Sequence, residues 1–120
     1  MKVTKLLFIC FVLITACQPK QKWPNEALHG KWDTSSWINL NNQQAINGQL
    51  DFNFKEDGRY VLDYGSKQVE GKYWIEGEYL HTIEDQQSEM KVKILTLTGD
   101  SLKIDMNRGG RMEQVILTKK

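Results

Sequence analysis

The sequence predicts an all-β protein: a single eight-stranded antiparallel up-and-down barrel, preceded by a short helical turn. Beyond about residue 30, apolar and polar residues alternate with the two-residue period of strands that have one dry face. Short runs rich in Gly, Asn and Asp separate these segments, and no long segment shows a helical period. Closing eight strands into a ring removes the exposed sheet edges that promote aggregation. An open meander and a two-sheet sandwich are the alternatives.

Residues 1–16 have the pattern of a targeting segment. Lys2 and Lys5 precede a short apolar run at 6–14, whereas a permanent membrane helix needs about 20 residues. The run leads into Ile14-Thr15-Ala16-Cys17, which resembles the lipobox of bacterial lipoproteins. The resemblance implies a signal peptide at 1–16 and a lipid anchor on Cys17. An ordinary secretory signal with an unrelated cysteine is the alternative.

Residues 17–27 are predicted to form the lipidated N-terminus and a polar tether. Gln18 stands where the inner-membrane retention signal of Gram-negative lipoproteins would have Asp, and no acidic run follows Cys17. By that resemblance the protein is expected at the cell envelope, in the outer membrane and facing the periplasm. Residues 24–28, with Pro24 at their start, predict one helical turn that acts as a lid or plug.

Charge and cysteine content exclude several classes of partner for the remaining domain, residues 28–120. Removing Lys2 and Lys5 leaves fourteen basic against fifteen acidic residues, so there is no basic surplus to bind nucleic acid. The lipobox resemblance implies that Cys10 is lost with the signal and that Cys17 is lipidated, which would leave no disulfide and no cysteine-containing metal site. The domain must therefore be stabilised by its core.

The hairpin at 50–64 is the clearest element of the sequence. Two alternating runs flank Asp57-Gly58, a pair that favours tight hairpin turns. Further strands are predicted at 31–40, 68–75, 79–83, 90–97, 102–106 and 112–117. The apolar phase changes near 94–96 and again near 113–115, which predicts a β-bulge at each place, with coverage on both faces as the alternative.

Two short motifs resemble lipocalins. Gly30-Lys31-Trp32 is similar to the Gly-x-Trp of the first lipocalin strand, and the segment from Glu70 to Leu102 looks like small bacterial lipocalin-like lipoproteins. The resemblance implies a lipocalin-like barrel with Trp32 as a plug at its base. In such a barrel Lys119, instead of the family's Arg, would lie beside Trp32, and Arg111 would lie at the opposite end.

The aromatic residues are the candidate binding residues. Inward-facing members could line a cavity for a small hydrophobic ligand or could simply fill the core: Phe52, Phe54, Tyr60, Tyr64 and Tyr73. A cavity is expected at the end that carries the loop at 39–48. Trp74 is predicted to face outward, where it would contact a partner protein or pack on neighbouring side chains.

Catalytic chemistry has little support in the sequence. It contains no nucleophile elbow, phosphate-binding glycine loop or zinc-protease motif. His81, Glu84 and Asp85 occupy a strand and its end, from which they cannot readily converge on a metal ion, and His29 stands alone. No catalytic residue, metal or cofactor is predicted.

Two functions remain. The favoured hypothesis is a membrane-anchored, non-enzymatic lipocalin-like lipoprotein that binds a small hydrophobic ligand at the cell envelope. The alternative is a solid barrel that acts as a protein-interaction, inhibitor or assembly subunit of the envelope.

Overall fold

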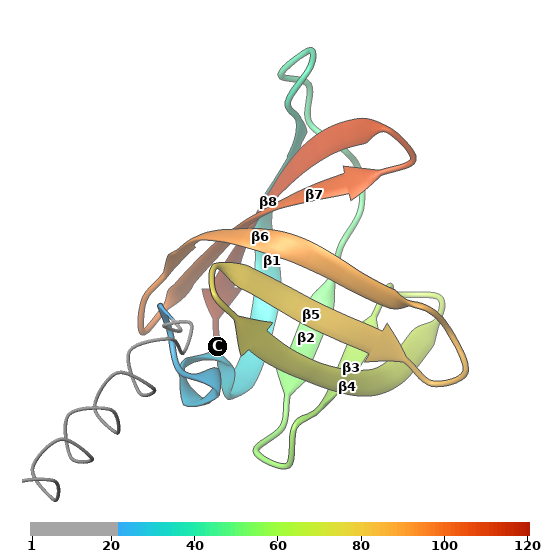
Figure 1. Cartoon of the computed structure of the whole chain (residues 1–120). Coiled ribbons are helices and arrows are strands. Elements are labelled where there is room, and N and C mark those ends of the chain that lie inside the picture. The colour runs from blue at the N-terminus through green and yellow to red at the C-terminus, as the bar shows by residue number, and fades with distance from the viewer. Residues whose placement is uncertain (1–21) are drawn as a thin grey trace, which may run out of the picture.

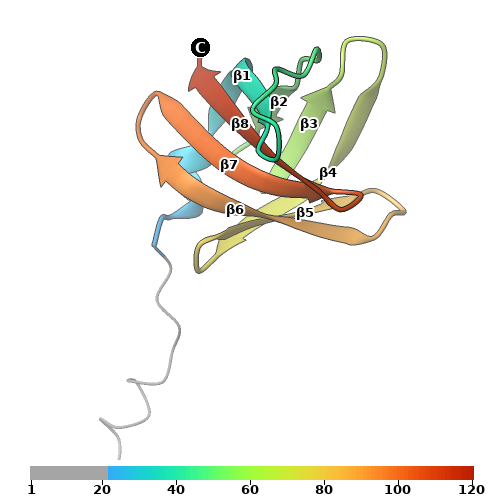
Figure 2. The same cartoon turned by 90° about the horizontal axis from the view of Figure 1, so that it is seen from above.

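The computed structural model describes residues 22–120, in which eight antiparallel strands close into one barrel (Figures 1 and 2). Each strand pairs with the next along the chain, and β8 pairs with β1 to complete the ring. This confirms the predicted fold class. The elements are the 3-10 turn η2 (Asn25–Leu28), β1 (Gly30–Asn39), β2 (Asp51–Phe54), β3 (Arg59–Asp63), β4 (Gln68–Glu76), β5 (Tyr79–Glu84), β6 (Glu89–Leu97), β7 (Ser101–Arg108) and β8 (Arg111–Lys119).

The two ends of the barrel differ, and we name them base and mouth. The base holds η2 and the turns that join β2 to β3, β4 to β5 and β6 to β7. The mouth holds the long β1–β2 loop and the other three turns. In Figure 1 the β1–β2 loop projects far from η2 and from the C-terminus. Cys17 and the rest of residues 1–21 lie outside the described residues.

Trp32 lies at the base of the barrel, next to η2. Leu28 and Trp32 are fully buried, and the Trp32 indole Nε1 donates a hydrogen bond of 2.8 Å to the Leu28 carbonyl oxygen. The Lys119 ammonium lies 5.4 Å from the Trp32 ring centroid, as expected for the last residue of the strand that closes the barrel. The predicted helical turn is thus confirmed as η2, and it seals the base.

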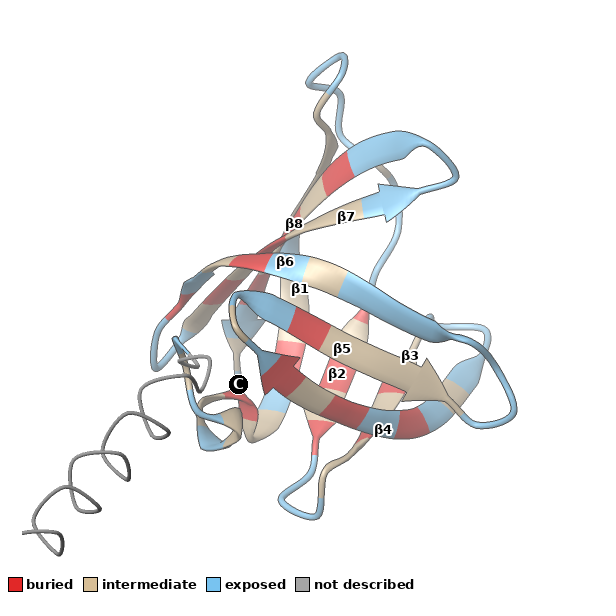
Figure 3. Ribbon diagram, in the orientation of Figure 1, coloured by how far each residue is buried: buried red, intermediate tan, exposed pale blue. Residues whose placement is uncertain are grey.

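The core fills the base half of the barrel. Buried residues of β2, seen through the gap between strands in Figure 3, belong to one aromatic stack. The Phe52 and Phe54 rings are 5.0 Å apart and nearly parallel, and Tyr73 meets Phe54 edge-on at 4.9 Å. The Tyr73 hydroxyl donates to the Lys55 carbonyl oxygen at 2.7 Å. These residues and Tyr60 are therefore packed core.

Tyr64 is not part of this core, although its phase in the sequence is that of Tyr60. Strand β3 ends at Asp63, and Gly65 takes a positive φ of 93°, so the chain turns away immediately after Tyr64. Although Tyr64 continues the inward phase of Tyr60 and Leu62, no strand wall extends far enough to cover it. Tyr64 is 47% exposed and lies at the mouth.

One of the two predicted bulges is present and the other is wrong. The β6–β7 register shifts between Ile94 and Thr96, as predicted. In contrast, β8 pairs with β7 without interruption, because the inward residue is Glu113, which shares the phase of the buried Val115. Met112 faces outward. The second shift lies in β1, between Thr34 and Ser36.

Candidate binding site at the mouth of the barrel

The inner wall of the barrel is incompletely covered in its mouth half. Val69 lies opposite the buried Leu62 and Thr82 lies opposite the buried Tyr73, so both share the inward phase. Nevertheless both are only half-buried. Val92 and Met106 are also half-buried and pack against the core. The mouth half therefore keeps inward-facing side chains within reach of solvent.

A buried carboxylate stands in this wall. Glu113 is fully buried, and its two carboxylate oxygens accept hydrogen bonds of 2.9 Å from Nε and Nη2 of Arg108. The Trp37 indole Nε1 donates a third, at 3.2 Å to Oε1. The guanidinium also lies over the Trp37 ring, 5.4 Å from its centroid. The three side chains thus join β1, β7 and β8 at the mouth.

The cluster is held in its charged form. Hydrogen bonds from Arg108, and then from Trp37, lower the pKa of Glu113 against the opposing effect of its burial, and Arg111 lowers it further. The hydrogen bonds between Arg108 and Glu113 raise the pKa of Arg108 in turn. A bidentate carboxylate–guanidinium pair is the geometry in which a buried charge is best compensated. Arg108 itself remains about half-exposed on the solvent side.

The β1–β2 loop folds back over the end of β1. Its Ile46 amide donates to the Trp37 carbonyl oxygen at 2.9 Å, and Ala45 forms an isolated bridge with Ile38. Gly48 lies so close to the Trp37 ring that a Cβ at this position would lie 2.6 Å from Cζ3. Trp37 is therefore enclosed between the loop and the Arg108–Glu113 pair.

A pocket of about 310 Å³ opens between β1 and this loop. Its lining combines apolar surface with hydroxyl groups and consists of Thr34, Ser35, Ser36, Trp37, Ile38, Ala45, Ile46 and Gly48. The volume is at the lower end of the range for small-molecule sites, about 300–1,000 Å³. It lies at the loop where the sequence predicts a cavity.

The opposite side of the mouth carries Tyr64 and Glu84, and the charge of Glu84 also acts on Tyr60 in the core. Burial, and then the charge of Glu84, raise the pKa of Tyr60, while a hydrogen bond with Thr82 acts in the opposite direction. Partial burial and the same carboxylate raise the pKa of the half-exposed Tyr64. One side of the mouth is therefore acidic and phenolic, whereas the other carries Arg108.

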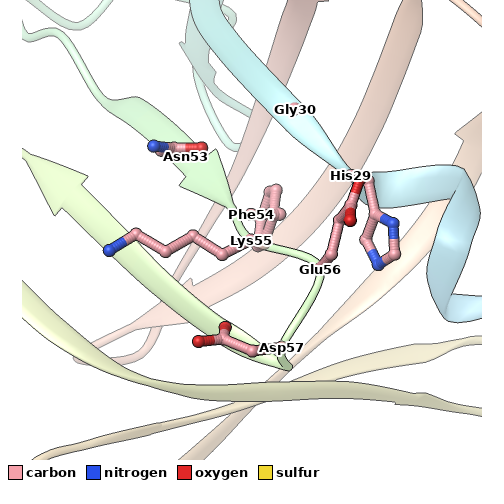
Figure 4. A pocket seen from close by; sticks show the side chains of 7 residues that line it. All are labelled: His29, Gly30, Asn53, Phe54, Lys55, Glu56 and Asp57. Carbon is pink, nitrogen blue, oxygen red and sulfur yellow. The ribbon is translucent and has the colours of Figure 1, made fainter.

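A second pocket, of about 550 Å³, lies at the base and is more open to solvent. It is lined by His29, Gly30, Asn53, Phe54, Lys55, Glu56 and Asp57, and Figure 4 shows Lys55 pointing away from His29 and Glu56. Within residues 22–120, no group of three or more His, Cys, Asp or Glu side chains could hold a metal ion. The turn residues here do not converge on one point, so we favour the mouth.

On the outer wall, Trp74 faces outward as predicted and packs on His81. The two rings are 5.2 Å apart and nearly parallel, and the His81 Nδ1 lies 2.8 Å from Glu89 Oε2. Trp74 is half-buried as a result. Asp85 instead pairs with Arg59 at 2.8 Å. His81 and Asp85 are therefore engaged with different partners.

Sequence reasoning missed the central residues of this site. The predicted strands leave Arg108 between 102–106 and 112–117, and the bulge expected near 113–115 depended on Met112 facing inward, which concealed the inward position of Glu113. A signal was present, since Glu113, Val115 and Leu117 share one phase of the last strand. A carboxylate in the inward phase next to a hairpin with two arginines indicates a buried ion pair.

Comparisons with known proteins support the fold. No family model matches the chain, and no curated protein is similar to it. A lipocalin-like protein from Bacteroides uniformis superposes with a TM-score of 0.61 at 16% identity, over 78% of this chain and 99% of that one. An uncharacterized protein from Bacteroides eggerthii gives 0.58 at 13%, over 77% and 98%. The chain therefore has a lipocalin-like fold.

Proposed function

We propose that the protein is a lipid-anchored lipocalin-like barrel that holds a small amphipathic molecule at its mouth, at the cell envelope and without catalysis. The mouth pocket beside Trp37 carries this proposal, because it adjoins the half of the barrel whose inner wall is incompletely covered. Its apolar side chains suit a hydrophobic moiety, and its hydroxyls suit a polar group.

The filled base limits the size of this ligand. Since Phe52, Phe54 and Tyr73 pack on one another, a long ligand has no room to reach the plug at Trp32. The ligand is therefore a small molecule bound near the rim. This narrows the prediction from sequence, in which the aromatic residues could either line a cavity or fill the core.

Titration of the chain that begins at Gln18 tests the proposal, since the complete barrel lies within residues 22–120. Fatty acids of several lengths are added while tryptophan fluorescence is followed, and the shorter ones are expected to bind more tightly than the longer ones. In an Ala45→Phe variant the added ring occupies the pocket, and affinity is expected to fall about tenfold or more. Asn47→Phe adds the same ring to the same loop, away from the lining, and is expected to bind normally. Equal affinity of both variants, or no binding by any compound, contradicts the proposal.

Anchoring has its own test. Within residues 22–120 no helix is long and apolar enough to span a bilayer. The anchor we propose is lipid on Cys17, because Ile14-Thr15-Ala16-Cys17 resembles a lipobox, and several acyl chains hold a protein far more firmly than one. Mass spectrometry of the N-terminal peptide is expected to show the acyl chains. A Cys17→Ala variant is expected to leave the membrane fraction, and its retention there contradicts the anchor.

A further inference from the structure

The chain enters the barrel at the base. The Lys22 amide donates to the Gly77 carbonyl oxygen in the β4–β5 turn at 3.5 Å, and Lys22 Nζ lies 3.7 Å from Glu78 Oε1. Its ammonium also lies over the Trp23 ring, 5.0 Å from the centroid, and Trp23 packs against the core. The first described residue is thus attached beside η2, at the end remote from the mouth (Figure 1).

The proposed anchor lies only a few residues before this point. Five residue steps separate Cys17 from Lys22, and a fully extended chain covers at most about 3.6 Å per step, or roughly 18 Å in all. Strand β8 has nine residues. At about 3.3 Å per residue and a tilt near 40°, the barrel wall rises roughly 20 Å from base to mouth. The β1–β2 loop extends beyond the strands (Figure 1).

From these lengths we infer that the barrel stands with its base toward the anchoring bilayer and its mouth toward the aqueous phase. For the mouth to face the bilayer, the tether would have to span the whole wall and the projecting loop, which it is too short to do. This inference rests on the proposed lipidation of Cys17. It deepens the proposed function, because the ligand then enters and leaves from the aqueous side.

Exposed side chains at both ends of the barrel could contact lipid, so the length of the tether determines which end faces the bilayer. Four large hydrophobic residues are exposed among residues 22–120, and three of them lie at the mouth: Tyr64, Met90 and Met112. Such a rim would favour contact with lipid if it could reach any. At the base, Trp23 and Lys22 form the aromatic–basic pair that suits a membrane–water interface. If the tether were longer than the barrel, the apolar rim at the mouth could turn and contact the bilayer.

Energy transfer on the lipidated full-length protein in vesicles tests this arrangement. With Cys17 acylated the mature chain has no other cysteine, so a single introduced cysteine carries a unique donor dye, and a labelled lipid is the acceptor. Gly99→Cys labels the base, where an added Cβ meets nothing within 4 Å, and Asn41→Cys labels the exposed mouth loop. Transfer from position 99 is expected to be about twofold higher or more, given the height of the wall. Equal or higher transfer from position 41 overturns the inference.

A tether variant tests the cause. Insertion of about twenty Gly and Ser residues between Pro19 and Lys20 gives the chain ample reach, so the difference between the two labels is expected to shrink. A difference that persists unchanged shows that the tether does not set the orientation. A chain found without acyl chains overturns the inference together with the anchor. If the protein is lipidated but energy transfer is higher from position 41 than from position 99, the orientation alone is overturned and the ligand titration is unaffected.

Discussion

Substituting Arg108 by Met is the sharpest perturbation of the mouth. The change removes both strong donors to Glu113 and leaves the indole Nε1 of Trp37 as the remaining hydrogen-bond donor to a fully buried carboxylate. Breaking a fully buried ion pair costs about 3–5 kcal/mol, whereas a surface pair is worth about 0–1. Since the Arg108 side chain is half-exposed, we expect a loss of about 2–3 kcal/mol near neutral pH.

The pH dependence identifies the cause of that loss. In the wild type the folded-state pKa of Glu113 is lowered, so its stabilising contribution is present above the unfolded-state pKa and is lost as pH falls through the folded one. In the variant the largest lowering cause is gone and burial remains, which raises the folded-state pKa. Protonation then favours the folded variant, and its deficit relative to the wild type should shrink on acidification.

Urea unfolding of the chain that begins at Gln18, monitored by fluorescence and circular dichroism at about pH 7 and pH 4, measures both effects. The Arg108→Met/Glu113→Gln double variant is the control, because a neutral amide oxygen still accepts from Trp37 without a buried charge; most of the stability should return. A deficit below about 0.5 kcal/mol, or one equal at both pH values, refutes the reasoning.

Three further predictions concern the barrel wall. Gly71→Ala places a Cβ against the backbone carbonyl of Ile83, which cannot move aside, so unfolding at lower urea or failure to fold is expected. Tyr73→Phe removes the hydrogen bond to the Lys55 carbonyl oxygen and should cost about 1 kcal/mol in urea unfolding. Burial raises the pKa of Tyr73 to about 12, so its contribution is present below the unfolded-state value and is lost as pH rises toward the folded one. The wild type should therefore lose stability above about pH 10, and the Phe variant should lose less, in alkaline urea titrations. Trp74→Ala should abolish capture of any partner that binds the outer wall while lowering the urea midpoint only modestly, because its ring packs on His81 at the surface and not in the core.

The barrel could be predicted from the sequence because the patterns that indicate strands and turns are local and agree with one another. Alternation, a tight Asp57-Gly58 turn and short connections allow only a few antiparallel arrangements, and the bulge in β6 followed from two apolar phases within one strand. Tyr64 shows the limit of alternation, which cannot tell where a strand ends. Only the turn at Gly65 places that side chain beyond the wall.

The mouth could not be derived in the same way, because its key contacts join residues from three strands. Trp37 and Glu113 are 76 positions apart, and their contact depends on the shifted β1–β8 register. That shift lies between Thr34 and Ser36, among small polar residues whose pattern carries no phase signal. A pocket made of β1 and a loop that returns over it is likewise a property of the folded chain.

Glu113 is both the residue at which the predicted strand phase of β8 was wrong and a residue next to the candidate binding site at the mouth. An apolar side chain of similar size would fill the same position with no charge to compensate, and such replacements are often neutral or stabilising. Stability alone therefore gives little reason for a fully buried carboxylate near the open end of this barrel. Local rules of sequence and structure are most often broken where a protein has a task to perform. The residue that breaks the apolar pattern of β8 contacts Trp37, which lines the mouth pocket, and this coincidence is the strongest reason to look for the ligand there.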